Sequence, residues 1–271
     1  MVPVSIVIIT KNEAEVIAGC ISRAKLITGD IVIIDNGSTD GTPEIAAAYG
    51  CRVYQNSWKG YGANKNIGVE LAKHEWVLSL DADEIPDMEL IRSLQSLELN
   101  DAGFVYDIKF RSYFGDKLIR FGSWGRGHHV RLFNRNLVRW SEQKVHEELI
   151  LPKQVKKKRL HGYLHHYSVK DARECRLKAF HYARLSAEKY FQNGREANFV
   201  NLFISPVFSF FMSYIVLLGF LDGKEGWDIS RFTFMNKWLK YHHLNQMKEN
   251  QQKKVIPEMD LTVEYEYSKG Q

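Results

Sequence analysis

The stretch Glu75-Trp76-Val77-Leu78-Ser79-Leu80-Asp81-Ala82-Asp83-Glu84 joins an apolar run of strand length to three acidic residues. On an extended chain every second side chain points to the same side, so Asp81 and Asp83 are expected to share a face and to flank Ala82. Carboxylates that gather at the end of a buried strand repel one another unless a cation compensates them. Hard oxygen ligands of this kind select Mg2+ or Mn2+ over zinc. The alternative is an acidic loop that binds nothing.

Strands and helices alternate through the first 100 residues. The pattern predicts strands at residues 4–9, 31–34, 51–54 and 76–80, and helices at 13–26, from 42 onward and at 62–73. Thr42 is expected to cap its helix, with Pro43 at the first helical position. Continuous apolar strands between helices imply an α/β fold with a mostly parallel sheet covered on both faces.

Polar residues cluster where these strands end. They are Thr10, Asn12, Asp35, Asp81 and Asp83. In parallel sheets of this kind, ligands bind at the carboxyl ends of the strands. The sequence therefore places a ligand site at that edge.

The remainder of the chain differs from the first 100 residues. Residues 102–168 predict shorter strands with mixed aromatic and basic side chains, and residues from 168 onward predict helices at 172–192, 198–221 and 227–247. We therefore expect three parts, which are residues 1–100, 101–168 and 169–271.

Composition places the chain among globular proteins of 271 residues, with a formal net charge of +5 and basic residues concentrated between 109 and 195. Such asymmetry suits an anionic partner: a nucleotide phosphate, an acidic membrane or a nucleic acid. No nucleic-acid-binding module accompanies the basic residues, so nucleic acid is not expected. Three cysteines without a CxxC spacing indicate a reducing compartment, and the N-terminus lacks the features of a signal peptide, so a cytoplasmic location is expected.

The first strand–helix turn, Thr10-Lys11-Asn12-Glu13-Ala14-Glu15, has no glycine and two acids. A dinucleotide fold requires a glycine-rich turn here to cradle phosphate, so this turn does not hold one. Asp35 still ends the second strand, where an acid commonly accepts a hydrogen bond from a ribose or base. A cation held by Asp81 and Asp83 would neutralise the diphosphate instead. The alternative for Asp35 is a turn-forming role in Asp-Asn-Gly-Ser.

Three segments in this order resemble family 2 glycosyltransferases with the GT-A fold. They are Val4-Ser5-Ile6-Val7-Ile8-Ile9-Thr10-Lys11-Asn12-Glu13, Ile33-Ile34-Asp35-Asn36-Gly37-Ser38-Thr39-Asp40-Gly41-Thr42 and Leu80-Asp81-Ala82-Asp83-Glu84. Further segments resemble bacterial lipopolysaccharide-core glucosyltransferases. They are Gly122-Ser123-Trp124, Val130-Arg131-Leu132-Phe133-Asn134-Arg135, Val145-His146-Glu147-Glu148 and Gly219-Phe220-Leu221-Asp222-Gly223-Lys224-Glu225-Gly226.

The resemblance implies a donor-binding half at 1–100, an acceptor-binding half at 101–168 and a membrane-associating helical region at 169–271. Within the donor half, Thr10, Asn12 and Glu13 would line the nucleotide pocket, and Asp35 would contact the base or ribose. Lys65 would approach the diphosphate, unless it is an exposed helix lysine.

The resemblance also implies the metal ligands. Asp83 would be the main ligand, with Asp81 on the ribose or on metal-bound water. His165 or His166 follows a short strand, and His166 is our candidate for a third ligand, unless it is merely hydrogen-bonded. Arg131 would bind phosphate bidentately, and its alternative is a salt bridge at a sheet edge.

Inverting transfer needs one base to deprotonate the acceptor hydroxyl and electrophilic support for the leaving diphosphate. Glu147 is the expected base by resemblance, with Glu148 in reserve, because only one of two neighbours on a strand can face inward.

Residues 202–221 carry no charge over a length that can span a bilayer. Pro206, the serines and Gly219 weaken that reading, so we favour a helix in the membrane interface over a true span or a buried core helix. Basic residues are expected to hold anionic headgroups or an acidic glycolipid, the alternative for the first five being a solvated hairpin turn. They are Lys153, Lys156, Lys157, Lys158 and Arg159, with Lys237 and Lys240.

The expected function is metal-dependent, inverting transfer of a hexose from a nucleotide-sugar such as UDP-glucose to a membrane glycolipid such as lipopolysaccharide core, at the inner face of the cytoplasmic membrane. One alternative is a polyprenyl-phosphate glycosyltransferase, whose acceptor phosphate needs no base. Others are a catalytically silent sugar-nucleotide or glycan-binding module and, more weakly, a phosphotransferase that uses the aspartate pair. The oligomeric state is left open.

Overall fold

The computed structural model describes residues 2–142 and 147–255. Within these residues nine strands form one mixed sheet and two short strands form a separate pair. The sheet contains β1 (Val4–Thr10), β2 (Ile31–Asp35), β3 (Arg52–Gln55), β4 (Trp76–Asp81), β5 (Glu84–Pro86), β6 (Phe104–Phe114), β7 (Lys117–Leu118), β8 (His128–Asn134) and β11 (Lys156–Val169), and the pair is β9 (Arg139–Trp140) with β10 (Leu149–Ile150). The helices of the sheet region are α1 (Ile17–Ala24), α2 (Thr42–Ala48), α3 (Tyr61–Leu71) and α4 (Met88–Gln95).

The strand order is β3-β2-β1-β4-β8-β6-β11-β5, with β7 beside β6. Strands β1 to β4 pair in parallel, as do β6 and β11, whereas β8 is antiparallel to both of its neighbours and β5 is antiparallel to β11. The prediction of a mostly parallel α/β sheet is therefore confirmed. Residues 1–100 and 101–168 both contribute strands to this one sheet.

Alternation along each strand explains the two hydrophobic layers. In β1, Ile6 and Ile8 pack on one face with residues of α1 and α4, whereas Val7 and Ile9 pack on the other face with Val69 of α3. Every residue of β1 and β2 is buried, as expected for strands covered on both sides. Because β1 pairs in parallel with both β2 and β4, the carboxyl ends of these three strands lie at one edge of the sheet.

Three local expectations need correction. The first helix begins at Ile17 rather than Glu13, because residues 11–16 form a loop in which Asn12 has a left-handed φ of 57°. Gly41, with a φ of 87°, is the N-cap of α2 in place of Thr42, whose hydroxyl instead accepts a hydrogen bond from the Glu13 backbone N–H. Asp83 lies in a turn and not on an extended strand, because β4 ends at Asp81.

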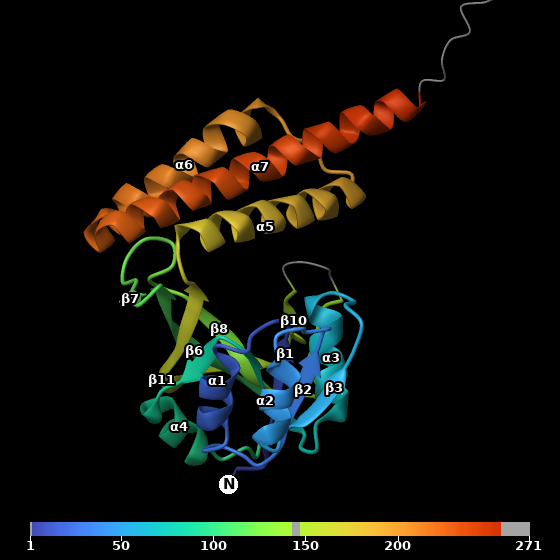
Figure 1. Ribbon diagram of the computed structural model, residues 1–271, viewed down its shortest axis with the longest axis vertical. Coiled ribbons are helices and arrows are strands. Elements are labelled where there is room, and N and C mark those ends of the chain that lie inside the picture. The colour runs from blue at the N-terminus through green and yellow to red at the C-terminus, as the bar shows by residue number, and fades with distance from the viewer. Residues whose placement is uncertain (1, 143–146, 256–271) are drawn as a thin grey trace, which may run out of the picture.

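The C-terminal helices form a separate layer beyond the carboxyl ends of the central strands (Figure 1). They are α5 (Ala172–Gln192), α6 (Ser205–Phe211) and α7 (Gly223–Val255), with short π-helical turns at Val200–Ile204 and Met212–Val216 and a 3-10 turn at Gly219–Asp222. Strand β11 leads into α5, which lies between α7 and the sheet, and α6 packs on α7. The expected helix at 172–192 is confirmed, whereas the one expected at 198–221 is continuous only from Val200 to Val216, since Leu218 adopts a left-handed φ of 60° and a 3-10 turn follows.

The basic residues expected to form one headgroup-binding group are separated. Lys156 to Arg159 are part of strand β11 and not of a hairpin turn. Lys237 donates a hydrogen bond to Ser209 over 2.6 Å, and Lys240 lies over the rings of Tyr190 and Tyr241, so both lysines are engaged within the helical layer.

Candidate active site

Asp81 lies at the centre of a network of charges at the end of β4. Its Oδ1 is 3.0 Å from Lys65 Nζ and its Oδ2 is 3.0 Å from an Arg131 guanidinium nitrogen. Burial alone would raise the pKa of Asp81, but Lys65 and Arg131 outweigh it and hold that pKa well below its usual range. Asp81 is therefore a carboxylate that already has two cationic partners.

Lys65 is not an exposed helix lysine, because only 2% of it is accessible. Its Nζ also lies 3.0 Å from Glu147 Oε1 and 4.6 Å from the centre of the Trp140 ring. Burial acts to lower the pKa of Lys65, but the carboxylates of Asp81 and Glu147 raise it overall. Lys65 thus joins the donor half of the sheet to the candidate base.

Arg131 reaches the site because β8 contains a bulge. Tyr106 pairs with Leu132 and Asp107 pairs with Val130, so Arg131 is the extra residue on its strand. A bulge re-aims a side chain next to a functional site. Here Arg131, 7% exposed, forms ion pairs with Asp81 and Glu84 through its guanidinium. The expected contact of Arg131 with phosphate stays a prediction.

Glu84 is a member of the network that the sequence did not identify as a site residue. It is fully buried, and its Oε2 accepts a hydrogen bond of 3.1 Å from the backbone N–H of Asp81. Burial, against the opposing charge of Arg131, raises the pKa of Glu84 to about 7. Its place directly after the aspartate pair was the available signal.

Asp83 and His166 face each other from different parts of the chain. His166 Nε2 lies 3.3 Å from Asp83 Oδ2, and its Nδ1 lies 3.0 Å from the Ser168 hydroxyl. Strand β11 brings His166 to this position, since it pairs there with Glu84 of β5. Burial acts to lower the pKa of His166, but Asp83 outweighs it and raises the pKa.

The fit of a divalent cation to these side chains is partial. Among the described residues, no three His, Cys, Asp or Glu side chains are arranged to hold a metal ion together. Asp83 and His166 can nevertheless supply two ligands, one of them a hard oxygen. Mg2+ usually binds through one or two protein ligands plus water and substrate phosphates, which matches this limited set.

Asp35 is turned into the loop that follows β2. It is fully buried, and its carboxylate accepts hydrogen bonds from the Thr10 hydroxyl and from the backbone N–H groups of Gly37 and Ser38 over 3.0–3.1 Å. The Ser38 hydroxyl donates a further bond. The structure thus gives Asp35 and Thr10 a turn-forming role, and direct contact with a nucleotide stays a prediction.

Asn12 and Glu13 lie in the neighbouring loop after β1. The Asn12 side chain accepts a hydrogen bond of 2.8 Å from the Thr39 backbone N–H, which fastens this loop to the loop after β2. Burial, followed by the negative charge of Asp83, raises the pKa of Glu13 to about 7. Both residues are at the edge where the resemblance places the nucleotide pocket.

Glu147 and Glu148 precede β10 and are not on a strand, so the expected alternation does not choose between them. Glu147 contacts Lys65 and has a side chain that is 16% exposed, whereas Glu148 is exposed and its backbone pairs with Ser141. Val145 and His146 of the same motif lie outside the described residues. The tertiary contacts therefore favour Glu147.

Helix α5 covers the site from the helical layer. The hydroxyls of Tyr182 and of Tyr61 in α3 lie 3.3 Å apart, and burial raises the pKa of Tyr182. Lys178 is close enough to Glu13 to lower its pKa. The polar periodicity of this helix gave no sign of that contact, because the bend from β11 into α5 decides which face meets the sheet.

Comparisons with known proteins agree with this geometry. The family model described as glycosyl transferase family 2 matches residues 5–150, more than half of the chain. An uncharacterized glycosyltransferase of Rickettsia typhi is 28% identical over 91% of this chain and 88% of its own length. The lipopolysaccharide core biosynthesis glycosyltransferase LpsC of Rhizobium meliloti is 29% identical over 83% of this chain and 87% of its own length.

Among solved structures, glucosyl-3-phosphoglycerate synthase from Mycobacterium tuberculosis in complex with Mn2+, UDP and glucosyl-3-phosphoglycerate overlaps in part. It is 23% identical, covers 42% of this chain and 44% of its own, and has a TM-score of 0.33. The family match, the sheet and the acidic edge lead to one conclusion: the chain belongs to glycosyl transferase family 2 and is a glycosyltransferase with the GT-A fold.

Proposed function

We propose that this enzyme transfers a hexose from a nucleotide-sugar, with UDP-glucose or a similar UDP-sugar as the donor, to a membrane glycolipid of the lipopolysaccharide-core type. The observation that carries the proposal is the meeting of Asp81, Asp83, His166, Lys65 and Glu147 at the carboxyl edge of the sheet. Two acids and a histidine suit a cation and diphosphate, and a separate glutamate is available as base. The relative LpsC supports the acceptor class.

Asp83 and His166 would hold the Mg2+ or Mn2+ ion, with Asp81 close by. A bound cation at this position stabilises the charge that develops on the leaving diphosphate. The loops that carry Asn12 and Glu13 would bind the nucleoside. Lys65 would keep its positive charge beside the diphosphate, since its pKa is raised by the neighbouring carboxylates.

Glu147 is assigned as the base. Its carboxylate accepts the proton of the acceptor hydroxyl while the hydroxyl oxygen forms a bond to the anomeric carbon, and the bond from that carbon to the diphosphate breaks on the opposite side. One such displacement inverts the configuration, and inversion is typical of family 2. The contact with Lys65 holds Glu147 in place before the acceptor arrives.

An outward-facing apolar stripe supports docking on a membrane. It recurs at helical spacing and consists of Ile204, Val207, Phe208, Phe211 and Ile215, each at least 43% exposed. The opposite side of the same segment is small and polar: Ser213 is 2% exposed and accepts a hydrogen bond from Ser230. A surface helix of a soluble protein has the reverse arrangement.

Within the described residues, no single helix is long and apolar enough to cross a bilayer, and Val200–Val216 with Gly219–Gln251 pass that test only as a pair bent by 69°. We propose that the stripe rests in the inner face of the cytoplasmic membrane, where the acceptor is anchored. The site beneath α5 would then face a substrate held at the same surface.

The decisive experiment measures equilibrium binding of UDP, GDP, CDP, ADP and their common sugars with and without Mn2+, on wild type and on Asp83→Ala. Tight binding of uridine nucleotides that requires both the metal and Asp83 is expected. Absence of metal-dependent binding for the whole panel would contradict the proposed donor site and favour a glycan-binding module.

A further inference from the structure

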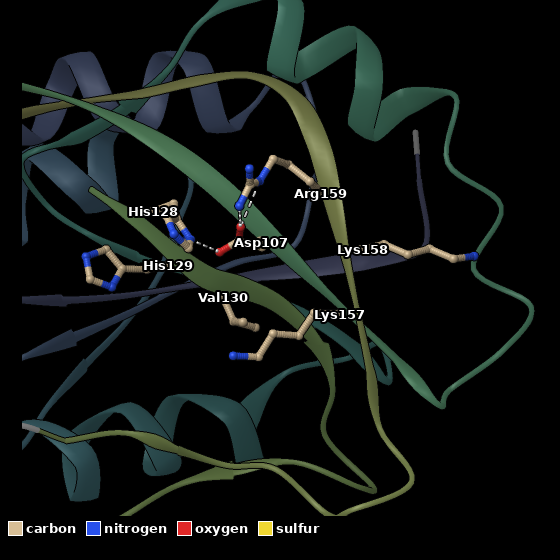
Figure 2. Close-up of a pocket in the computed structure, with 7 residues that line it drawn as sticks. All are labelled: Asp107, His128, His129, Val130, Lys157, Lys158 and Arg159. Atoms are coloured by element: carbon tan, nitrogen blue, oxygen red, sulfur yellow. Dashed lines mark hydrogen bonds and ion pairs between the residues drawn. The ribbon is translucent and has the colours of Figure 1, made fainter. Parts of the chain in front are cut away.

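A basic hollow of about 330 Å³ lies on the sheet (Figure 2), and none of its lining residues belongs to the carboxylate network. Strands β6, β8 and β11 form it, and its lining residues include Asp107, His128, His129, Val130, Lys157 and Arg159. Lys158 also borders it, but its side chain points away and lies over the Phe104 ring.

Asp107 anchors the cationic groups of this hollow. Its side chain is 9% exposed, its Oδ1 lies 2.9 Å from His128 Nδ1, and its Oδ2 accepts two hydrogen bonds from Arg159 over 2.9–3.0 Å. A carboxylate at Nδ1 orients the imidazole and leaves Nε2 for another partner. The buried acid therefore holds two partly exposed nitrogen-rich side chains in place.

Some hydrogen-bond donors of the hollow remain unused after the bonds to Asp107 are made. Arg159 uses Nε and Nη2 on Asp107, while its guanidinium carries five N–H donors. Lys157 extends across the hollow toward Val130 (Figure 2). Arg159 and Lys157 carry two positive charges against the one negative charge of Asp107, so the hollow has a net positive charge even with His128 neutral. Guanidinium and ammonium groups in this number suit the oxygens of a phosphate or carboxylate.

The hollow and the candidate base are on the same side of the sheet. Asp107 and Val105 alternate onto one face, and Val105 packs in the hydrophobic cluster that contains Trp140, whose ring lies under Lys65. Strand β8 alone separates β6 from β4, so these two strands lie about 10 Å apart at the usual strand spacing. Tyr106 is level with Leu78 of β4 through Leu132, so Asp107 lies a few residues before Asp81 along the strand direction. An extended glycan at Glu147 would have to cover both offsets to reach the hollow.

We propose that this hollow binds an anionic group, a phosphate or a carboxylate, on the acceptor glycan. This inference rests on the proposed function and makes it more specific. The acceptor is an acidic glycolipid whose anionic group binds to Lys157, Arg159 and His128. The acid would be recognised at a distance from the reacting hydroxyl, by residues other than the catalytic groups.

The test compares Lys157→Glu with Lys156→Glu. Lys156 is the neighbouring exposed lysine on β11 and does not line the hollow. Sugar transfer from labelled UDP-glucose, or from whichever nucleotide-sugar the binding panel selects, is measured with a bacterial lipopolysaccharide-core glycolipid as acceptor. Lys157→Glu is expected to raise the acceptor KM about tenfold or more, which is the scale of one lost charged hydrogen bond, with donor affinity unchanged. Lys156→Glu should behave as wild type.

Two further arms identify the anion. The acceptor is treated with phosphatase in one and has its carboxylates reduced in the other, and the treatment that removes the bound group should raise the wild-type KM to the level of Lys157→Glu. Equal KM values for both lysine variants would overturn the inference. The inference would also be overturned if Lys157→Glu weakened the binding of inorganic phosphate but left sugar transfer unchanged. If wild type transfers no sugar at all, it is the proposed function that fails, and the donor-binding panel shows this separately.

Discussion

Lys65 connects two acids that have different tasks in the proposed reaction. Asp81 belongs to the diphosphate end of the site and Glu147 to the acceptor end, and one buried ammonium contacts both over 3.0 Å. Since a buried carboxylate without a partner is costly, Lys65 stabilises the ionised form of Asp81, and the same ammonium group contacts Glu147. Lys65 therefore links the positions of the side chains at the diphosphate end and at the acceptor end of the site.

Replacing Glu147 by Gln removes the proposed base and keeps the side-chain volume. We expect kcat to fall by about 10²- to 10⁴-fold, the usual contribution of a general base, while binding of the nucleotide donor is retained. Steady-state transfer assays and donor titrations measure the two quantities separately.

The same assays on Glu148→Gln decide between the neighbouring glutamates. Activity close to wild type is expected because Glu148 is exposed. Loss of activity in Glu148→Gln alone would move the role to that residue. Full activity in Glu147→Gln would instead favour an acceptor phosphate that needs no base, as in the polyprenyl-phosphate alternative.

Helix α3 has to approach β1 and β2 closely to place Lys65. Gly68 makes this possible: a Cβ there would lie 2.3 Å from Val7 Cγ1 and 3.2 Å from Ile34 Cγ1. Strand β8 shows a second device of the same scale, since its bulge turns Arg131 toward the acids. In each case a single residue positions a side chain of the site: Gly68 allows the close approach of α3, and the bulge in β8 redirects Arg131.

Gly68→Ala is expected to lower the free energy of unfolding by about 1–3 kcal/mol through overpacking, although alanine favours helices. Gly19→Ala in α1 is the matched control, because its Cβ would meet only the flexible tip of Ile85 at 3.3 Å. The control should be neutral or slightly stabilising. Urea denaturation measures both, and equal stability of the two variants would refute the packing argument.

At the scale of the whole molecule, one buried acid joins distant segments of the sheet region. Asp30, 5% exposed, accepts hydrogen bonds from Ser5 of β1, from the backbone N–H of Lys73 after α3, and from Arg52 of β3. Burial acts to raise the pKa of Asp30, but these partners outweigh it and lower the pKa.

A lowered pKa in the folded state predicts the direction of the pH effect. The stabilisation by Asp30 is fully present above the unfolded pKa of about 3.9 and is lost as pH falls toward the lower folded value. Asp30→Asn should therefore cost about 2 kcal/mol at pH 7, with the difference from wild type shrinking below pH 4. Denaturant titrations at several pH values test this, and the exposed Asp116→Asn should show no such difference.

The helical layer contributes a surface and not only a cover for the site. Replacing both Phe208 and Phe211 by Ser should weaken sedimentation with vesicles of phosphatidylglycerol and phosphatidylethanolamine at least about tenfold, because each phenylalanine loses part of its transfer free energy. Leu26→Ser, exposed at the end of α1, is the control and should bind as wild type. Unchanged vesicle binding by the double variant would remove the proposed role of the stripe.

The amino-acid sequence by itself determined the α/β class, the positions of the first four strands along the chain and the strand ends where the acids gather. These features follow from β-branched runs, helical periodicity and the position of Asp81 at a strand end, all of which are local along the chain. Helix 172–192 was predictable for the same reason. The family resemblance added the candidate roles, and the family match confirmed the enzyme class.

Only the tertiary structure decided which side chains contact one another at the site. Asp83 meets His166, Arg131 pairs with Glu84, Asp35 turns into its own loop, and the apolar stripe of α6 faces outward. Each of these features depends on strand register, on a bulge or on the packing of a whole helix. Residues far apart in the chain jointly determine register, bulges and packing. Periodicity identifies an apolar face, but the neighbours that a fold brings to that face decide whether it is covered.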